Sequence, residues 1–326
     1  MKRALVCGAG GFIGSHLVKR LKDEGNWVRG ADLKYPEFSE TKADEFSILD
    51  LRSRRSCVES LALSPKEQFD DVYQLAADMG GAGYIFTGEH DLEVMHNSAS
   101  INLNFVDLSE RYKKIFYSSS ACIYPEEAQV KENHPGLKED EAYPANPDSE
   151  YGWEKLFSER LYLSLMRNKG TPVRITRFHN IYGPEGAWND GREKAPARLS
   201  RQVAEMKYSG RDSIEIWGDG NQTRSYLYID EALEGIRRLM DSDFIGPVNI
   251  GSTEDISVND LTYKIAKIAG QDVKLVYTPG PIGVRGRNSN NDLILEKLGW
   301  APNYPLSKGI ETTYRWIEDQ VRNSRE

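Results

Sequence analysis

Short apolar runs alternate along the chain with longer stretches in which apolar residues recur at helical spacing. The first unit is an apolar strand at residues 4–7, a glycine turn and a helix expected at 12–24, with Gly25 as its C-terminal cap. Further buried strands are predicted at residues 27–32, 71–75, 114–118, 173–176 and 247–250. Helical spacing is found at residues 53–64, 97–111, 261–269 and 306–322.

This alternation predicts an α/β fold, built on a Rossmann-type, doubly wound parallel sheet with helices on both faces. Two of the predicted strands come late in the chain, so we expect residues of a second domain to interrupt the sequence of the sheet domain. The sheet domain is expected to comprise residues 1–178 and about 226–252. A smaller C-terminal α/β domain is expected from about 179–225 and 253–326.

Composition excludes several classes of protein. Among 326 residues, 42 Lys and Arg stand against 50 Asp and Glu, and this net charge of −8 gives no reason to expect a nucleic-acid partner. No apolar run of about 18 residues suggests a membrane span, and the first residues lack the apolar stretch of a signal peptide. Three cysteines without a CxxC pair argue against a disulfide framework or a structural zinc site. We therefore expect a cytoplasmic protein without a metal.

The glycine turn after the first strand has the spacing GxxGxxG, with Gly8, Gly11 and Gly14. Such a turn brings a pyrophosphate against a helix N-terminus, where Phe12 and Ile13 would border it. Asp32 ends the second strand, where a carboxylate accepts hydrogen bonds from both ribose hydroxyls and repels a 2′-phosphate. A glycine turn without a ligand is the alternative, and nearby Arg29 and Lys34 could weaken the preference. The pattern predicts NAD rather than NADP, bound by the sheet domain.

Four further residues are candidates to border the cofactor, because they follow strands at the carboxyl edge of the predicted sheet. They are Asp50, Leu51, Leu75 and Ala77. Each of them, taken alone, is better explained as plain structure than as part of a site.

Tyr151 and Lys155 form a YxxxK pair, and positions i and i+4 share one face of a helix. A lysine ammonium beside a phenol favours the phenolate, which lowers the tyrosine pKa and turns the residue into a base. Ser120 lies at the end of an apolar strand and can hydrogen-bond the same substrate oxygen. With the glycine motif, this set resembles the extended short-chain dehydrogenase/reductase family. The resemblance implies that Ser120, Tyr151 and Lys155 move hydride between a sugar carbon and NAD.

Cys122 stands two places after Ser120, where sugar-nucleotide 4,6-dehydratases of that family resemble one another in having a glutamate. A thiol there is a candidate acid/base for carbon, because a ketone at C4 makes the hydrogens on C3 and C5 acidic. Inversion of a carbon also needs a group on the opposite face, and Lys194 in the 191–196 segment is the candidate. The alternatives are a packing cysteine, as we expect for Cys7 and Cys57, and a lysine in a solvated loop.

Six segments resemble the branch of this family that inverts GDP-mannose at C3 and C5: residues 77–81, 121–125, 177–184, 191–196, 217–220 and 284–289. That resemblance implies an NAD-dependent epimerase with a transient 4-keto sugar, forming GDP-L-galactose and the 5-epimer GDP-L-gulose. It implies Cys122 and Lys194 as the acid/base pair, and a homodimer paired through helices at 97–111 and 151–166. The nucleotide-sugar substrate would contact residues of both domains: Gly81, Ser120, Asn180, Glu193, Lys194, Trp217, Gln222 and Arg287.

Arg287, with Arg285 near it, and Asn180 are the expected partners of the diphosphate, because a guanidinium fork matches phosphate oxygens. Two other functions stay open at this stage. An NDP-sugar 4-epimerase would share every residue except the pair Cys122 and Lys194. A non-catalytic NAD(H)-binding protein would not need Tyr151 and Lys155.

Overall fold

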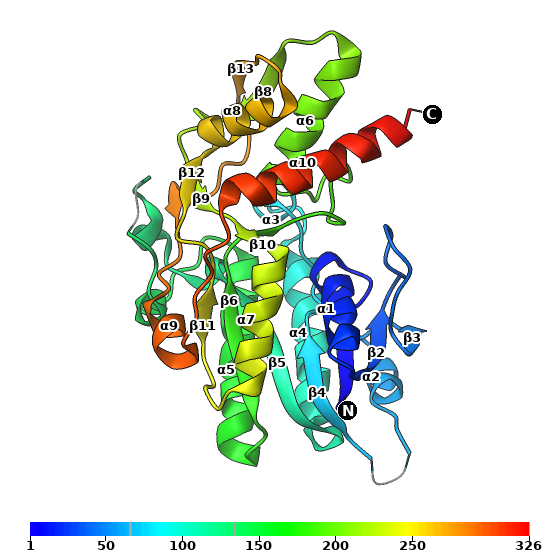
Figure 1. Cartoon of the computed structure of the whole chain (residues 1–326). Coiled ribbons are helices and arrows are strands. Elements are labelled where there is room, and N and C mark those ends of the chain that lie inside the picture. The colour runs from blue at the N-terminus through cyan, green and yellow to red at the C-terminus, as the bar shows by residue number, and fades with distance from the viewer. Residues whose placement is uncertain (65–66, 133–134, 326) are drawn as a thin grey trace.

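A seven-stranded parallel sheet forms the centre of the computed structural model, which describes residues 1–64, 67–132 and 135–325 (Figure 1). The strand order is β11-β6-β5-β4-β1-β2-β3, and every neighbouring pair is parallel. The strands are β1 (Arg3–Cys7), β2 (Trp27–Asp32), β3 (Glu45–Ile48), β4 (Phe69–Gln74), β5 (Tyr112–Ser120), β6 (Val173–Phe178) and β11 (Val248–Ile250). This confirms the predicted doubly wound sheet and all six predicted strands.

The sequence analysis missed β3. This strand has only four residues at the edge of the sheet, and all of them are exposed or half-buried. It therefore lacks the apolar run that identifies a buried strand. From β1 the chain first adds β2 and β3 on one side, and then crosses to add β4, β5, β6 and β11 on the other side. The direction in which strands are added therefore reverses between β1 and β4.

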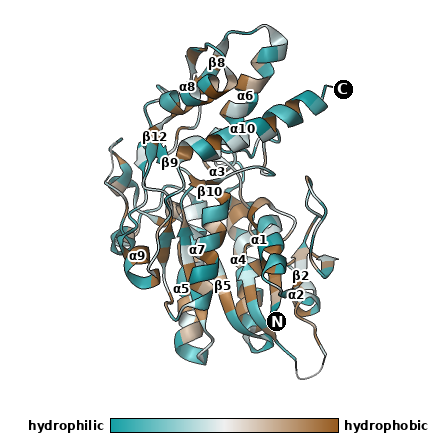
Figure 2. Cartoon of the chain, viewed as in Figure 1, coloured by the Kyte–Doolittle hydropathy of each residue, from teal (hydrophilic) through white to brown (hydrophobic). Residues whose placement is uncertain are grey.

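Helices cover both faces of the sheet, because successive side chains of each strand point to opposite faces. Ala4 and Val6 of β1 join the apolar cluster under α1 (Phe12–Asp23) and α7 (Ile229–Asp241). Leu5 and Cys7 join the cluster under α2 (Arg54–Ser60), α4 (Asp91–Asp107) and α5 (Glu150–Lys169). In Figure 2, α7 and α10 turn largely hydrophilic faces outward while apolar residues gather on the strands.

The remaining chain lies mainly above the carboxyl ends of the strands, where helices α6, α8 and α10 contact one another (Figure 1). Three small sheets are present among the described residues. Their strands are β7 (Ile181–Tyr182), β8 (Ser213–Trp217), β9 (Thr223–Ser225), β10 (Leu227–Tyr228), β12 (Asp255–Ser257), β13 (Lys274–Thr278) and β14 (Gly286–Arg287). The helices are α3 (Ala82–Ile85), α6 (Ala195–Ser209), α8 (Val258–Ala269), α9 (Asp292–Leu298) and α10 (Leu306–Asn323). Short 3-10 helices are η1 (Ser109–Arg111), η2 (Ala121–Ile123), η3 (Glu126–Gln129) and η4 (Glu139–Ala142).

The predicted helices are found as α1, α2, α4, α5, α8 and α10, whereas the sequence analysis did not expect α6 or α7. The division into two domains with the boundaries given above stays a prediction. One continuous apolar cluster contains residues of α1 and α7 as well as of α6, α8 and α10. Helices α6, α8 and α10 therefore pack against the sheet region.

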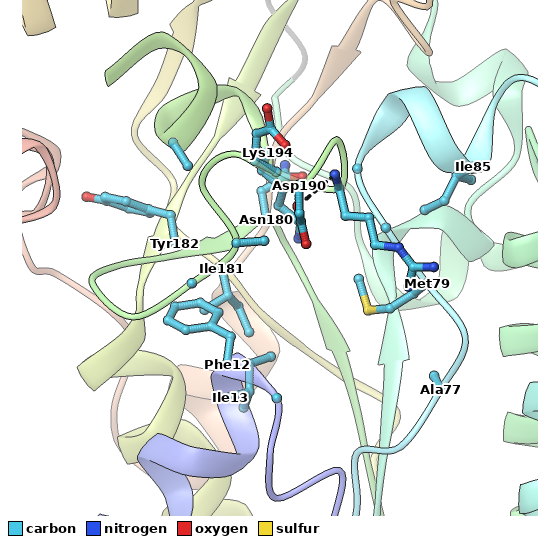
Figure 3. A pocket seen from close by; sticks show the side chains of 18 of the residues that line it. Phe12, Ile13, Ala77, Met79, Ile85, Asn180, Ile181, Tyr182, Asp190 and Lys194 are labelled. Atoms are coloured by element: carbon cyan, nitrogen blue, oxygen red, sulfur yellow. Dashed lines mark hydrogen bonds between the residues drawn. The ribbon is translucent and has the colours of Figure 1, made fainter. Parts of the chain in front are cut away.

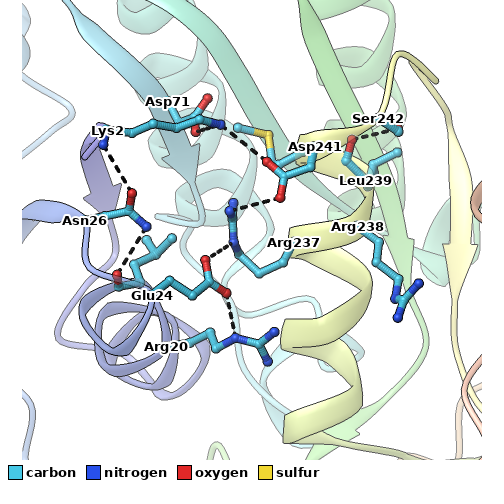
Figure 4. Close-up of polar contacts among 12 residues, drawn as sticks. Lys2, Arg20, Glu24, Asn26, Asp71, Arg237, Arg238, Leu239, Asp241 and Ser242 are labelled. Atoms are coloured by element: carbon cyan, nitrogen blue, oxygen red, sulfur yellow. Dashed lines mark hydrogen bonds and ion pairs between the residues drawn. The ribbon is translucent and has the colours of Figure 1, made fainter.

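A polar network at the amino ends of the strands ties α1 and α7 to the sheet (Figure 4). The Arg237 guanidinium contacts Glu24 at 2.8 Å and Asp241 at 3.2 Å, and Lys2 contacts Asp71 at 3.1 Å. Because Glu24 directly follows α1, these contacts hold the far end of that helix. Its first turn is thereby kept at the carboxyl ends of the strands, where the site lies.

Across the three described stretches, we find no helix with both the length and the apolar character needed to cross a bilayer.

Candidate active site

A cavity of about 1010 Å³ opens at the carboxyl ends of the strands, where the strand order reverses between β1 and β4. Open α/β sheets bind their ligands at this point. Apart from Arg285, the structure brings every predicted site residue to the lining of this one cavity: Gly8, Gly11, Phe12, Ile13, Gly14, Asp32, Asp50, Leu51, Leu75, Ala77, Gly81, Ser120, Cys122, Tyr151, Lys155, Asn180, Glu193, Lys194, Trp217, Gln222 and Arg287. Figure 3 shows Phe12 and Ile13 below Asn180 and Lys194, with Met79 and Ile85 across the cavity.

The turn from β1 into α1 requires glycine at three of its positions, one of them Gly10, where a Cβ would lie 2.0 Å from the Lys34 carbonyl oxygen. Gly8 has a φ of +80°, a left-handed conformation that side chains disfavour. A Cβ on Gly14 would lie 2.0 Å from the carbonyl oxygen of Gly8. The first turn of α1 therefore lies directly against the end of β1, and no side chain caps its N-terminus at Gly11. This cradle fits a pyrophosphate, as the glycine motif predicts.

Asp32 presents its carboxylate at the end of β2, on the cavity. Its Oδ2 accepts a hydrogen bond from the Gly10 N–H at 2.9 Å, and its Oδ1 accepts one from the Leu33 N–H at 2.6 Å. Arg29 is turned away from it, because its guanidinium donates to Glu45 at 2.8 Å and to the Ala62 carbonyl at 2.6 Å. Lys34 contacts Glu37 at 3.5 Å. Arg29 is therefore not placed to receive a 2′-phosphate, whereas Lys34 lines the cavity with Asp32.

We expect the protein to bind NAD at least about tenfold more tightly than NADP, because a 2′-phosphate would meet the Asp32 carboxylate. Replacing Asp32 by asparagine removes the charge with little change of shape and should narrow that difference. Isothermal calorimetry with both cofactors measures the dissociation constants. Tighter binding of NADP by the unaltered protein would contradict the prediction.

The other candidate cofactor residues lie along the strand ends beside this cradle. Leu75 donates its N–H to the Cys7 carbonyl at 3.2 Å, and Leu51 is buried. The Asp50 carboxylate already contacts the guanidinium of Arg52 at 2.7 Å, and this contact lowers the pKa of Asp50. With Ala77 they form one wall of the cavity. Their predicted role in bordering the cofactor stays a prediction.

Ser120, Tyr151 and Lys155 meet between the end of β5 and the first turns of α5. The Ser149 hydroxyl caps this helix by accepting from the Gly152 N–H at 3.3 Å. One turn separates Tyr151 from Lys155, and the Lys155 Nζ lies 5.6 Å from the centre of the Tyr151 ring. Lys155 also donates to the Ser118 carbonyl at 2.9 Å, which anchors its ammonium under the cavity.

The prediction that Lys155 lowers the pKa of Tyr151 is wrong. Burial raises the pKa of Tyr151 well above its ordinary value, and Cys122 raises it further, while a hydrogen bond with Ser120 opposes both. Burial lowers the pKa of Lys155, and the nearby carboxylate of Glu154 opposes that change. Burial therefore outweighs the lysine charge on which the sequence argument rested.

Cys122 lies in η2, directly after β5, and 9% of it is exposed. A Cβ on Gly152 would lie 2.2 Å from the Cys122 carbonyl oxygen, so only glycine lets α5 approach this turn. The Arg287 guanidinium donates to the Cys122 Sγ at 3.0 Å. Cys7 and Cys57 are fully buried in the core, and burial raises the pKa of both thiols, that of Cys57 to about 12. Their interpretation as packing residues is confirmed.

Lys194 occupies the N-cap position of α6, and its carbonyl accepts hydrogen bonds from Ala197 and Arg198 at 3.0 Å each. The sequence analysis placed it in a loop, although Pro196 in the first turn is a typical helix-start signal. Burial lowers the pKa of Lys194, Cys122 raises it and Arg287 lowers it further. Lys194 thus lies near enough to the thiol for their charges to interact, from a different part of the chain.

The expected substrate residues line the upper part of the cavity. A Cβ on Gly81 would lie 2.6 Å from the Glu193 carbonyl oxygen, and the Glu193 carboxylate contacts Arg201 at 3.1 Å. Gln222 donates to the Trp217 carbonyl at 3.1 Å. Asn180 donates to the Ser225 carbonyl at 3.0 Å. Among the described residues, the Glu193 Oε2 and Gln222 Oε1 atoms are buried without a hydrogen-bond partner. The roles of these residues toward a substrate stay predictions.

The two arginines expected at the diphosphate have different surroundings. Arg285 does not line the cavity; its guanidinium contacts Asp219 at 2.7 Å and also Glu132. The suggestion that Arg285 helps to hold a diphosphate is therefore not supported. Arg287 does line the cavity, beside Cys122.

Charged residues that the sequence analysis did not single out also lie in or beside this site. Asp148 contacts Arg287 at 2.9 Å, and the Arg198 guanidinium lies 4.2 Å from the centre of the Trp217 ring. Arg224 lines the cavity and donates to the Val284 carbonyl at 2.6 Å. Arg198 follows Lys194 by one turn of α6, so recognising that helix would have indicated it. No local pattern marks Asp148 or Arg224.

A hydroxyl, a phenol, a thiol and two amines therefore share one cavity. These groups can move a proton at an oxygen and at a carbon. Within residues 1–64, 67–132 and 135–325, no cluster of three His, Cys, Asp or Glu side chains could hold a metal ion.

Comparison with known proteins agrees with this geometry. A sequence model of the "NAD dependent epimerase/dehydratase family" matches residues 4–251. The chain is 45% identical to the GDP-mannose 3,5-epimerase of Arabidopsis thaliana, over 98% of this chain and 83% of that protein. It is 44% identical to GDP-mannose 3,5-epimerase 1 of Oryza sativa subsp. japonica, over 99% of this chain and 83% of that protein. The solved UDP-glucuronic acid 4-epimerase of Bacillus cereus, in complex with UDP-glucuronic acid and NAD, superposes with a TM-score of 0.76 and 25% identity, over 98% of this chain and 99% of that one. The chain therefore belongs to the NAD-dependent epimerase/dehydratase family.

Proposed function

We propose that this chain is an NAD-dependent GDP-mannose 3,5-epimerase. It converts GDP-mannose into GDP-L-galactose, and forms the 5-epimer GDP-L-gulose, through a transient 4-keto sugar. The observation that carries this proposal is that Cys122 and Lys194 line the same cavity as Ser120, Tyr151 and Lys155. The 45% identity to the Arabidopsis thaliana protein of that name supports the same substrate.

The first step takes place at the C4 oxygen. Tyr151 removes the hydroxyl proton through its phenolic oxygen, Ser120 hydrogen-bonds the same C4 oxygen, and the Lys155 ammonium stabilises the phenolate. The glycine cradle and Asp32 would hold NAD, which would supply the hydride acceptor for C4 and the source of the returning hydride, so that the cycle would need no external reductant. The phenol of Tyr151 returns the proton to the C4 oxygen at the end of the cycle.

The second step takes place at carbon, next to the C4 ketone. The Cys122 thiolate takes the proton from C5, and the Lys194 ammonium donates one to the opposite face, which inverts that carbon. The same pair acts on C3. Burial and the neighbouring guanidinium lower the pKa of Lys194, and this makes its ammonium a stronger acid than an exposed lysine.

Incubation with GDP-mannose in heavy water, followed by NMR of the products, tests this function. We expect deuterium at C5 and C3 and none at C4, because the hydride on C4 does not exchange with solvent. An NDP-sugar 4-epimerase would change C4 and leave C3 and C5 without deuterium. A non-catalytic NAD(H)-binding protein would leave GDP-mannose unchanged. Either result would contradict the proposal.

We also propose a homodimer, paired through α4 and α5. These two helices contact each other, and together they expose four large apolar side chains, Leu92 and Leu103 on α4 and Trp153 and Phe157 on α5. Trp153 and Phe157 are one helical turn apart and share a face. An exposed apolar patch of this kind is typical of a subunit interface.

Replacing Phe157 by glutamate should convert the dimer into a monomer, because the new charges would face each other across a two-fold axis. Light scattering after gel filtration measures the mass. Tyr277→Glu on β13 is the matched control, because Tyr277 is a similarly exposed aromatic residue far from α5 in the fold. A monomeric mass for the unaltered protein would contradict the dimer.

A cytoplasmic location is a further part of the proposal. All three cysteines are free thiols, which is typical of a reducing compartment.

A further inference from the structure

The Arg287 guanidinium contacts three side chains at once. It donates to the Cys122 Sγ at 3.0 Å, to the Asp148 Oδ2 at 2.9 Å and to the Gln129 side-chain oxygen. Arg287 is only 5% exposed, and the side chains of Asp148 and Gln129 are buried as well. Both ends of the guanidinium and its Nε are thus occupied by protein groups.

The partners of Arg287 are themselves held in place. Gln129 donates its amide N–H groups to the carbonyls of Tyr124 at 3.0 Å and Pro125 at 3.2 Å, so its oxygen has to face Arg287. Asp148 directly precedes Ser149, the residue that caps α5, and accepts from the Ser149 hydroxyl at 3.3 Å. The direction of the guanidinium toward the thiol is therefore set from both sides.

Charge favours an anionic sulfur at this place. A guanidinium stays protonated in proteins, and a buried one needs negative partners. Asp148 is one such partner, and a Cys122 thiolate would be the second. The charged or titratable groups whose charges interact with Cys122 are otherwise cations and a phenol: Arg287, Arg224, Lys155, Lys194 and Tyr151. Hydrogen bonds and cations favour the charged form of an acid.

We propose that Arg287 is a positioning residue for Cys122, and that Asp148 and Gln129 aim its guanidinium at the sulfur, so that Arg287 stabilises the thiolate through which Cys122 acts. The inference rests on the proposed function, in which this thiolate takes the C5 proton. In this proposal Arg287 acts on the Cys122 sulfur whether or not a diphosphate is bound. Asp148 acts on the same sulfur indirectly, by holding Arg287. A guanidinium that only held the diphosphate would have no effect on the sulfur of the substrate-free protein.

The test is the pH dependence of alkylation of Cys122 by iodoacetamide, in NAD-loaded protein without a sugar nucleotide. A thiolate reacts and a thiol does not, so the pH midpoint of the reaction reports ionisation of the sulfur. Mass spectrometry of the peptide carrying Cys122 gives the extent of reaction. Cys7 and Cys57 are fully buried and provide internal controls for unfolding.

Arg287→Gln should raise the pH midpoint by about one unit or more, because it removes both the charge and the donor at the sulfur. Arg287→Lys keeps the charge and should restore part of that shift. Asp148→Asn keeps nearly the same side-chain shape and should raise the midpoint by a smaller amount. If Arg287→Gln does not fold, the midpoint of Asp148→Asn decides the test. Arg285→Gln is the matched control and should leave the midpoint unchanged, because Arg285 lies outside the cavity.

An unchanged midpoint in Asp148→Asn and in folded Arg287→Gln would overturn the proposal. If these variants instead raise only the KM for GDP-mannose, Arg287 serves the diphosphate and the inference falls. Failure of the proposed function would look different. In that case the unaltered protein would take up no deuterium from heavy water, while the alkylation midpoints would still separate the variants.

Discussion

Replacing Cys122 by serine is expected to abolish deuterium uptake at C5 and C3, with a loss of at least about 1000-fold, while C4 oxidation stays within about tenfold of normal. Serine keeps the shape and the hydrogen bond with Arg287, but its hydroxyl is a far weaker acid than a thiol. The 4-keto sugar should therefore form and return to GDP-mannose without inversion. NMR locates the deuterium, and absorbance of the reduced cofactor in the same samples follows oxidation.

Lys194→Ala completes this experiment, because it removes the group on the opposite face. Proton removal by Cys122 should continue, so deuterium washes in from one face while inversion stalls. Cys57→Ser is the matched control for a cysteine substitution, since Cys57 is buried in the core and donates to the Leu51 carbonyl at 3.0 Å, a bond that serine can also make. If Cys122→Ser inverts C5 at the normal rate, Cys122 is a packing residue and the acid/base assignment is wrong.

Replacing Tyr151 by phenylalanine should stop the reaction one step earlier. Without the phenolic oxygen, nothing in the site takes the C4 hydroxyl proton, so we expect C4 oxidation to fall by at least about 1000-fold. Exchange at C3 and C5 should fall equally, because both require the ketone. In the unaltered protein the rate of oxidation should rise with pH through the neutral range, since burial raises the pKa of Tyr151 and only the phenolate accepts the proton.

Tyr162→Phe is the matched control for Tyr151→Phe. Tyr162 lies on the same helix, is fully buried, and donates to the Asn102 side-chain oxygen at 3.1 Å. Its loss should lower stability by about 1 kcal/mol and leave the activity unaltered. Deuterium exchange at C5 by Tyr151→Phe at the normal rate would rule out the 4-keto route.

The parts of this protein that the sequence determined are those set by local geometry. An apolar strand, a glycine turn and an amphipathic helix form β1 and α1 because each depends on residues a few positions apart. The close approach of Gly14 to Gly8 and the place of Asp32 at the end of β2 follow from the same motif. The spacing of Tyr151 and Lys155 places both on one face of α5 wherever that helix lies.

Edges and surfaces were harder to predict. β3 lies at the rim of the sheet, where half-exposed residues leave no apolar run, and α6 was overlooked although Pro196 marks its first turn. The sequence analysis therefore missed Arg198, which follows Lys194 on that helix.

Contacts between distant segments were decided by the tertiary structure. Arg285 and Arg287 are two residues apart, yet the first contacts Asp219 while the second reaches Cys122, because two residues of extended chain span about 6.6 Å. Asp148, in the loop before α5, and Gln129, at the end of η3, are more than a hundred residues away from Arg287 in sequence. The sequence likewise suggests a lysine that lowers the pKa of Tyr151, but the depth of the cavity makes burial the larger effect. Burial and charge placement depend on how the whole chain packs, and no local pattern specifies them.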